Sequence, residues 1–195
     1  MIHEILRNKK VVLASGSPRR KQIFSMIGLN ALQFTPNTDE TINTRNPRKF
    51  VLEQSEIKCR AVASKMDLSC VTVAADTIVF LNGRIVGKPE NIFQATNCLS
   101  ELSGNSHYVY TGVTVCYRNR YISEYAKSKV KFKTLDMYEI ESYINTKEPM
   151  DKAGSYGIQG YGCQFVEKIT GCYFNVMGFP VNLFYEMLKK LNIEN

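Results

Sequence analysis

Apolar residues recur along this chain with two different periods, and together they predict a mixed α/β fold. Short apolar or alternating runs are typical of strands, whereas apolar residues three and four positions apart are typical of amphipathic helices. The pattern predicts strands at residues 11–14, 32–35, 71–80, 107–117, 121–132, 163–169 and 172–177, with a hairpin over 79–86. It predicts helices at residues 18–27, 47–66, 90–102, 137–145 and 181–191. Strands and helices alternate early and hairpins follow, which favours two lobes around a cleft.

The first predicted loop combines a helix start with two arginines. Ser17 is a natural N-cap and Pro18 a natural first helical residue, since that position does not need a backbone N–H. The free N–H groups and the helix dipole favour an anion there, whereas Arg19 and Arg20 oppose the dipole unless an anion or an acidic side chain lies close. Two interpretations stay open: a phosphate-binding turn, or a solvated helix start.

A single charged residue, Asp76, interrupts the apolar strand at 71–80. An isolated buried carboxylate costs several kcal/mol unless it is paired or binds a cation. The alternatives are a salt bridge with a buried Lys or Arg, and a role as metal ligand or base. The Asn-Gly turn that follows brings Lys88 back near Asp76 if the strands pair. Lys58 lies beside the apolar face of its helix, and most such lysines extend to water.

Two loops carry further polar residues. Asp39 and Glu40 are adjacent carboxylates in a polar loop, where the usual state is solvated. Residues 147–162 hold four glycines among charged and amide side chains, including Lys152 and Gln159. Such a backbone can approach a ligand closely, and we interpret the segment as a binding loop rather than as a flexible surface loop.

Composition restricts the classes of partner. The formal net charge of +7 is spread along the chain, which favours a small anionic ligand in a cleft over a long nucleic-acid track. Six scattered cysteines and two histidines do not form the spacings of a zinc site or a disulfide framework. Neither a membrane-length apolar run nor the core of a signal peptide is present, so a cytoplasmic location is expected.

The remaining chemistry is that of oxygen ligands and cations. His3 and His107 offer poor support for a Ser-His or Cys-His nucleophile, and the chain lacks a Walker-type loop. Carboxylates without histidine or cysteine suit Mg²⁺ or Mn²⁺, and cations beside such a metal describe a polyphosphate site. That site supports attack of water on phosphorus.

Several motifs, taken together, resemble the Maf family of nucleoside triphosphate pyrophosphatases. In chain order they are Ser-Gly-Ser-Pro-Arg-Arg, Ala-Ala-Asp-Thr, Gly-Lys-Pro, Leu-Ser-Gly-x-x-His with Thr-Gly-Val, Glu-Pro-Met-Asp-Lys-Ala-Gly-x-Tyr-Gly-Ile-Gln-Gly, and Val-Met-Gly-Phe-Pro. The resemblance implies one catalytic domain over residues 1–195. Its fold would be an elongated, twisted mixed sheet with two lobes around a deep cleft, related to inosine triphosphate pyrophosphatases and of the Maf/HAM1 type.

The resemblance also implies a reaction and a set of site residues. A nucleoside triphosphate and water would give the monophosphate and pyrophosphate, with a divalent cation as cofactor and a homodimer as the assembly. Asp76 matches the family's proton acceptor, which can equally be a metal ligand. By the same match, the other catalytic residues are Lys58 and Lys88, the second metal ligand is Glu40, and the substrate-binding residues are Ser15, Arg19, Arg20, Thr77, Lys152 and Gln159.

The subgroup that this chain resembles at Arg19, Thr77 and Gln159 acts on dTTP and UTP, whereas a sister group prefers 7-methyl-GTP. A glutamine amide offers a donor and an acceptor to a pyrimidine edge. The alternative function is a nucleotide- or nucleic-acid-binding regulator of cell division without turnover. Asp76 argues against it, because a bare carboxylate repels phosphate unless a metal intervenes. An inactive structural protein is the third alternative.

Overall fold

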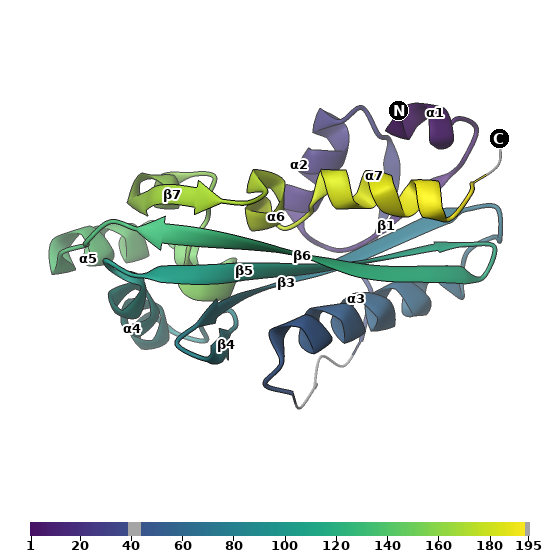
Figure 1. The fold of residues 1–195 in the computed structure, drawn as a ribbon. Coiled ribbons are helices and arrows are strands. Elements are labelled where there is room, and N and C mark those ends of the chain that lie inside the picture. Colours follow the sequence, from purple (N-terminus) through teal and green to yellow (C-terminus); the bar gives the residue numbers. More distant parts are fainter. Residues whose placement is uncertain (39–43, 194–195) are drawn as a thin grey trace.

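The computed structural model describes residues 1–38 and 44–193, and their strands form one mixed sheet (Figure 1). The strand order is β2-β1-β3-β5-β6-β7, and β4 pairs with β3 beside this path. The pairs β1–β2 and β1–β3 are parallel and the others are antiparallel. The bounds are β1 Val11–Ala14, β2 Ala31–Phe34, β3 Val71–Leu81, β4 Arg84–Val86, β5 Ser106–Tyr117, β6 Arg120–Phe132 and β7 Val166–Thr170.

Helices cover both faces of the sheet. In Figure 1, α2 and α7 lie on one face and α3 on the other, while α4 and α5 lie toward the far end of the long strands. None of the described helices is both long and apolar enough to cross a membrane. The bounds are α1 Ile2–Ile5, α2 Pro18–Met26, α3 Pro47–Ala63, α4 Ile92–Leu102, α5 Met137–Asn145, α6 Tyr173–Met177 and α7 Val181–Lys190, with 3₁₀ turns at Glu148–Asp151, Ala153–Ser155 and Tyr161–Phe165.

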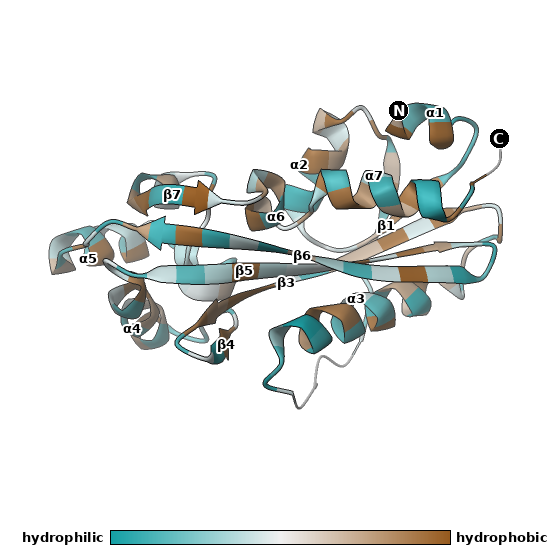
Figure 2. Cartoon of the chain, viewed as in Figure 1, coloured by the Kyte–Doolittle hydropathy of each residue, from teal (hydrophilic) through white to brown (hydrophobic). Residues whose placement is uncertain are grey.

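Alternation along β1 explains the layers at one end of the sheet. Val11 and Leu13 join a buried cluster that includes Phe24 of α2 and Phe184 of α7. Val12, the residue between them, joins a cluster on the other face that includes residues of α3. Figure 2 shows α3 and α7 with both hydrophobic and hydrophilic residues, as expected of helices that cover a sheet with one side. Both faces of β1 are therefore buried.

The long strands pass from one apolar cluster into a second. On β3, Val71 and Val73 belong to the cluster with α2 and α7, whereas Val79 and Leu81 belong to a cluster with α4 and α5. The polar residue Asp76 lies on the same strand between these two groups. These two buried clusters thus lie toward opposite ends of the shared strands, and Asp76 and Thr77 lie between them along β3.

The predicted mixed α/β class and most predicted elements are confirmed, but the region before α7 differs. Residues 172–177 were expected as a strand and form the helix α6, which ends at Gly178 with φ of 108°. Residues 163–165 belong to a 3₁₀ turn, and β7 is limited to Val166–Thr170. The error has a physical reason, since periodicity cannot separate a short apolar strand from a short buried helix.

Close packing of α3 on the sheet depends on a glycine. Gly112 of β5 pairs with Asp76 of β3, and a Cβ at residue 112 would lie 2.1 Å from the backbone oxygen of Val51 on α3. Nearby, the Oγ atom of Ser55 on α3 lies 2.9 Å from Oγ1 of Thr114 on β5. Only glycine allows the helix backbone to approach the strand this closely at the level of Asp76.

We therefore predict that Gly112→Ala destabilises the fold by at least about 2 kcal/mol, because α3 must move away from the sheet. Urea unfolding measures the change. Gly87→Ala is the matched control, since a Cβ at residue 87 meets no atom within 4 Å. Equal stability of the two variants would contradict the role assigned to Gly112.

Candidate active site

A cavity of about 620 Å³ opens where one edge of β3 is unpaired between β1 and β4, while β5 pairs with the other edge. The pairing of β1 with β3 ends at Ala14 and Ala74, and that of β4 begins at Val79 and Val86. Residues 76–78 of β3 line the cavity in this interval, together with the loop that follows β1. In α/β sheets, ligands bind in the crevice at the carboxyl ends of parallel strands, and this cavity has that position.

Most of the site residues predicted from the sequence meet in this cavity. The predicted residues that line it are Ser15, Arg19, Arg20, Lys58, Asp76, Thr77, Lys88 and Lys152. Gln159 does not line it, although its neighbour Ile158 does. Glu40 and Asp39 lie outside the described residues. Within residues 1–38 and 44–193, His, Cys, Asp and Glu do not gather in any group of three or more that could hold a metal.

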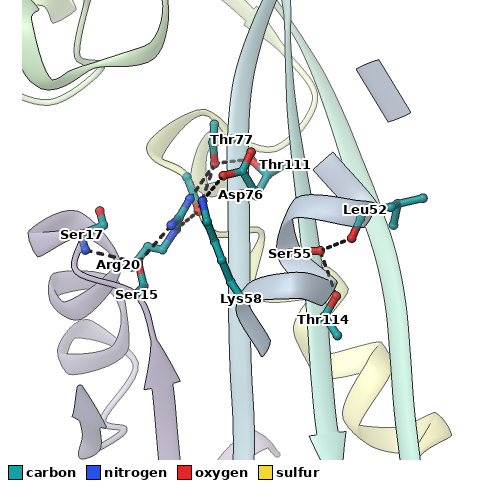
Figure 3. A network of polar contacts seen from close by, with 11 residues as sticks. Ser15, Ser17, Arg20, Leu52, Ser55, Lys58, Asp76, Thr77, Thr111 and Thr114 are labelled. Carbon is teal, nitrogen blue, oxygen red and sulfur yellow. Dashed lines mark hydrogen bonds and ion pairs between the residues drawn. The ribbon is translucent and has the colours of Figure 1, made fainter. Parts of the chain in front are cut away.

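Asp76 of β3 forms an ion pair with Lys58 of α3, drawn in Figure 3. Lys58 Nζ donates to Asp76 Oδ1 over 2.7 Å, and the two side chains are only 12% and 14% exposed. The usual expectation for Lys58, a side chain extended to water, is therefore wrong. The salt bridge considered for Asp76 exists, and it lies in the wall of a cavity instead of inside a closed core.

Arg20 is the centre of a second network, on the side of β3 that faces α2 and α6 (Figure 3). Its Nη1 donates to Ser15 Oγ over 3.0 Å, its Nη2 to Thr77 Oγ1 over 3.1 Å, and its Nε to the carbonyl oxygen of Gly178 over 2.9 Å. The guanidinium thus joins three segments that are far apart in sequence. Such a planar fork is difficult to replace with lysine.

The start of α2 differs in detail from the expected cap. The side chain of Ser17 makes no capping hydrogen bond, and the backbone N–H of Ser17 donates to Ser15 Oγ over 3.2 Å. Ser15 therefore accepts hydrogen bonds from both the loop and Arg20. Pro18 occupies the first turn of α2 as predicted.

Several polar residues around the cavity were not assigned from the sequence. Thr111 Oγ1 lies 3.0 Å from Thr77 Oγ1 and 3.1 Å from the carbonyl oxygen of Asn175. Asp151 contacts two of the predicted cations, with Oδ1 2.6 Å from Lys152 Nζ and Oδ2 3.7 Å from Arg19 Nη1. The one sequence signal for Thr111 and Asp151 was that both lie within the motifs of the family resemblance. The contacts of Thr111, and that of Asp151 with Arg19, join segments that are distant in sequence, so these contacts could not be predicted from the order of residues.

The histidine in β5 is a packing residue. His107 is 1% exposed, and its Nε2 lies 2.8 Å from the hydroxyl oxygen of Tyr156. Burial lowers the pKa of His107 to about 4, so its ring is neutral at physiological pH. This environment agrees with the expectation that His107 does not activate a nucleophile.

The sequence matches one family model and several relatives that share one name. The family model described as "Maf-like protein" matches residues 10–191. A dTTP/UTP pyrophosphatase of Clostridium tetani is 44% identical over 187 residues, covering 93% of this chain and 97% of the relative. Proteins of the same name from Clostridium perfringens and from Thermoanaerobacter sp. are 43% and 40% identical, and they cover 94% and 93% of this chain and 98% and 96% of the relatives.

A solved structure gives a comparison of the fold. The Ham1 protein of Staphylococcus aureus superposes with a TM-score of 0.54 over 94% of this chain and 100% of that chain, at 14% sequence identity. The expected relationship to that fold is therefore confirmed, at an identity where only the fold is informative.

The two adjacent arginines predict a sharp contrast in stability. Arg20→Lys removes at least two of the three hydrogen bonds, and we expect it to lower the free energy of unfolding by about 2 kcal/mol. Arg19→Lys is the control, because the ion pair of Arg19 with Asp151 is long and partly solvated, and it should cost less than about 1 kcal/mol. Urea unfolding of both variants is the measurement. Equal losses would show that the Arg20 network does not support the fold.

Proposed function

The chain belongs to the Maf-like protein family, and from this we propose that it hydrolyses dTTP and UTP to the monophosphate and pyrophosphate. The observation that carries the proposal is the cavity, which is lined by cations from three separate segments and by the Lys58–Asp76 ion pair. These cations are Arg19, Lys88 and Lys152. We take the whole chain as one catalytic domain with two lobes.

In the proposed complex the cations hold the triphosphate. Arg19 lies in the first turn of the nine-residue helix α2, where backbone N–H groups and the dipole also favour an anion. A guanidinium can bind phosphate oxygens in two places, whereas Lys88 and Lys152 act as point charges. Charge that develops on the departing pyrophosphate would be stabilised by the same groups. Asp151 forms ion pairs with Arg19 and Lys152 in the free protein. The phosphates of the substrate would replace Asp151 in these contacts.

Asp76 is the proposed centre of the chemistry. Asp76 would either accept the proton of the water that attacks phosphorus or bind a divalent metal cation. Lys58 holds the carboxylate in the cavity wall through their 2.7 Å contact. It also supplies a positive charge beside the reacting groups.

A divalent cation, magnesium or manganese, is part of the proposal. Magnesium in phosphate sites is commonly bound by one or two carboxylates and the substrate's own oxygens, so Asp76 in the cavity wall fits such a site without a larger cluster. Glu40 is the second predicted ligand. When bound, the ion would neutralise phosphate oxygens.

Pyrimidine selection is assigned to Thr77 and Gln159, together with Arg19. Thr77 lies in the cavity wall, and Gln159 directly follows the lining residues Gly157 and Ile158. The amide of Gln159 would pair with the edge of the base once its side chain turns toward the cavity, with the loop backbone in place. A homodimer stays a prediction from the family resemblance, and a cytoplasmic location stays a prediction from the sequence.

A panel of nucleoside triphosphates with magnesium tests the reaction. We expect dTTP and UTP to be consumed fastest, with equal amounts of monophosphate and pyrophosphate, because the proposed cut lies between the α and β phosphorus atoms. Chromatography with phosphate-specific detection identifies the products. Release of orthophosphate would contradict the proposed bond, and tight binding without turnover would favour the regulator alternative.

Asp76→Asn tests the assignment of the carboxylate. We expect kcat to fall by at least about 10²-fold with little change in fold, because asparagine is nearly isosteric but cannot accept the proton or bind the cation as strongly. Asp67→Asn is the matched control, since Asp67 is exposed and its Oδ1 accepts from Ser69 N, a bond that an asparagine oxygen can keep. Steady-state turnover of UTP is the measurement, and an active Asp76→Asn enzyme would reject the assignment.

A further inference from the structure

The carboxylate of Glu148, in the 3₁₀ turn that precedes the glycine-rich loop, accepts three hydrogen bonds. Its Oε1 accepts from the hydroxyl of Tyr143 over 2.9 Å and from the backbone N–H of Gly162 over 3.2 Å. Its Oε2 accepts from the backbone N–H of Tyr161 over 2.9 Å. This half-buried carboxylate has no role in the proposed reaction.

The glycines of this loop fit around Glu148. Gly160 has φ of +83°, and a Cβ there would lie 2.5 Å from Glu148 Oε2. A Cβ at Gly162 would lie 2.7 Å from the hydroxyl oxygen of Tyr143. Residues with side chains could not pass so close. The glycines therefore allow the loop backbone to wrap a side chain of the same protein, in addition to any ligand.

Two routes connect Glu148 to the cavity wall. The buried hydroxyl of Tyr143 accepts from the backbone N–H of Gly157 over 3.2 Å, and Gly157 lines the cavity. The backbone oxygen of Glu148 accepts from Lys152 Nζ over 2.7 Å, and Lys152 also lines the cavity. Gln159 lies on the short stretch between the anchored N–H groups of Gly157 and Tyr161.

We propose that Glu148 is a positioning residue, whose carboxylate fixes the loop over residues 157–162 so that Gln159 and Lys152 are held for the base and the phosphates. This inference rests on the proposed function. Glu148 does not itself contact the reacting atoms. Without its carboxylate the loop would occupy several conformations, and the substrate would bind only the competent fraction.

Glu148→Ala tests the proposal. We expect KM for UTP to rise about tenfold or more, because at least one charge-assisted hydrogen bond that orders the loop is lost, while kcat stays within about threefold. Glu148→Gln should give an intermediate KM, since its amide keeps one acceptor oxygen but cannot accept at both positions. Glu141→Ala, an exposed position on α5, is the control and should match the wild type.

Hydrogen exchange supplies a readout that does not depend on turnover. The amides of Tyr161 and Gly162 should lose protection in Glu148→Ala and keep it in Glu141→Ala. Unchanged protection, or a fall in kcat with unchanged KM, would overturn the positioning role. If Glu148→Ala does not fold, Glu148→Gln carries the same test.

Failure of the proposed function would be visible separately. In that case the wild type would release no pyrophosphate, and KM could not be measured. The dissociation constant for the α,β-imido analogue of UTP, which cannot be cleaved between the α and β phosphorus atoms, would then be measured instead. Weaker binding of the analogue by Glu148→Ala than by Glu141→Ala then supports the proposal. Equal binding by the two variants overturns it.

Discussion

The ion pair between Lys58 and Asp76 joins the 17-residue helix α3 to the central strand β3, and its location explains much of the surrounding structure. Removing two charges from water costs several kcal/mol per ion, so such a pair needs close geometry and well-packed support. The support comes from two apolar cores toward opposite ends of the long strands, and from Gly112, which lets α3 approach the sheet directly beside Asp76. A costly polar group is thereby held in the only interval of β3, within the described chain, that lacks a strand partner on the β1/β4 side.

The same interval gives the cavity its two kinds of wall. Asp76 and Thr77 are adjacent on a strand, so their side chains point to opposite faces of the sheet. One contacts α3 and the other contacts Arg20 of α2, and both reach the cavity because the strand edge itself is open there. The Arg20 network then ties the loop after β1 to the carbonyl oxygen of Gly178 at the end of α6. Hydrogen bonds thereby fix residues from the N-terminal and C-terminal parts of the chain around one site.

Local patterns in the sequence were sufficient for most elements and for most of the site. The lone charge of Asp76 in an apolar strand, the loop before Pro18 and the turn before Lys88 each indicated a residue that lines the cavity. Features that depend on packing between distant segments could not be predicted from the sequence. The helix α6 was expected as a strand because five residues do not distinguish the two periods, and the buried partner of Lys58 could not be read from its helix alone. The glycine-rich loop was assigned to ligand contact, whereas three of its hydrogen bonds and the close approaches of Gly160 and Gly162 involve Glu148 or Tyr143.

In the proposed complex the cavity is a triphosphate site, lined by cations from separate segments and by the ion pair of Asp76 with Lys58. A crystal structure of the protein with magnesium and the α,β-imido analogue of UTP tests this claim most directly. We expect the three phosphates to lie in the cavity against Arg19, Lys88 and Lys152, with the α phosphorus nearest to Asp76. Phosphates bound outside this cavity, or turned so that Asp76 faces only the base, would contradict it.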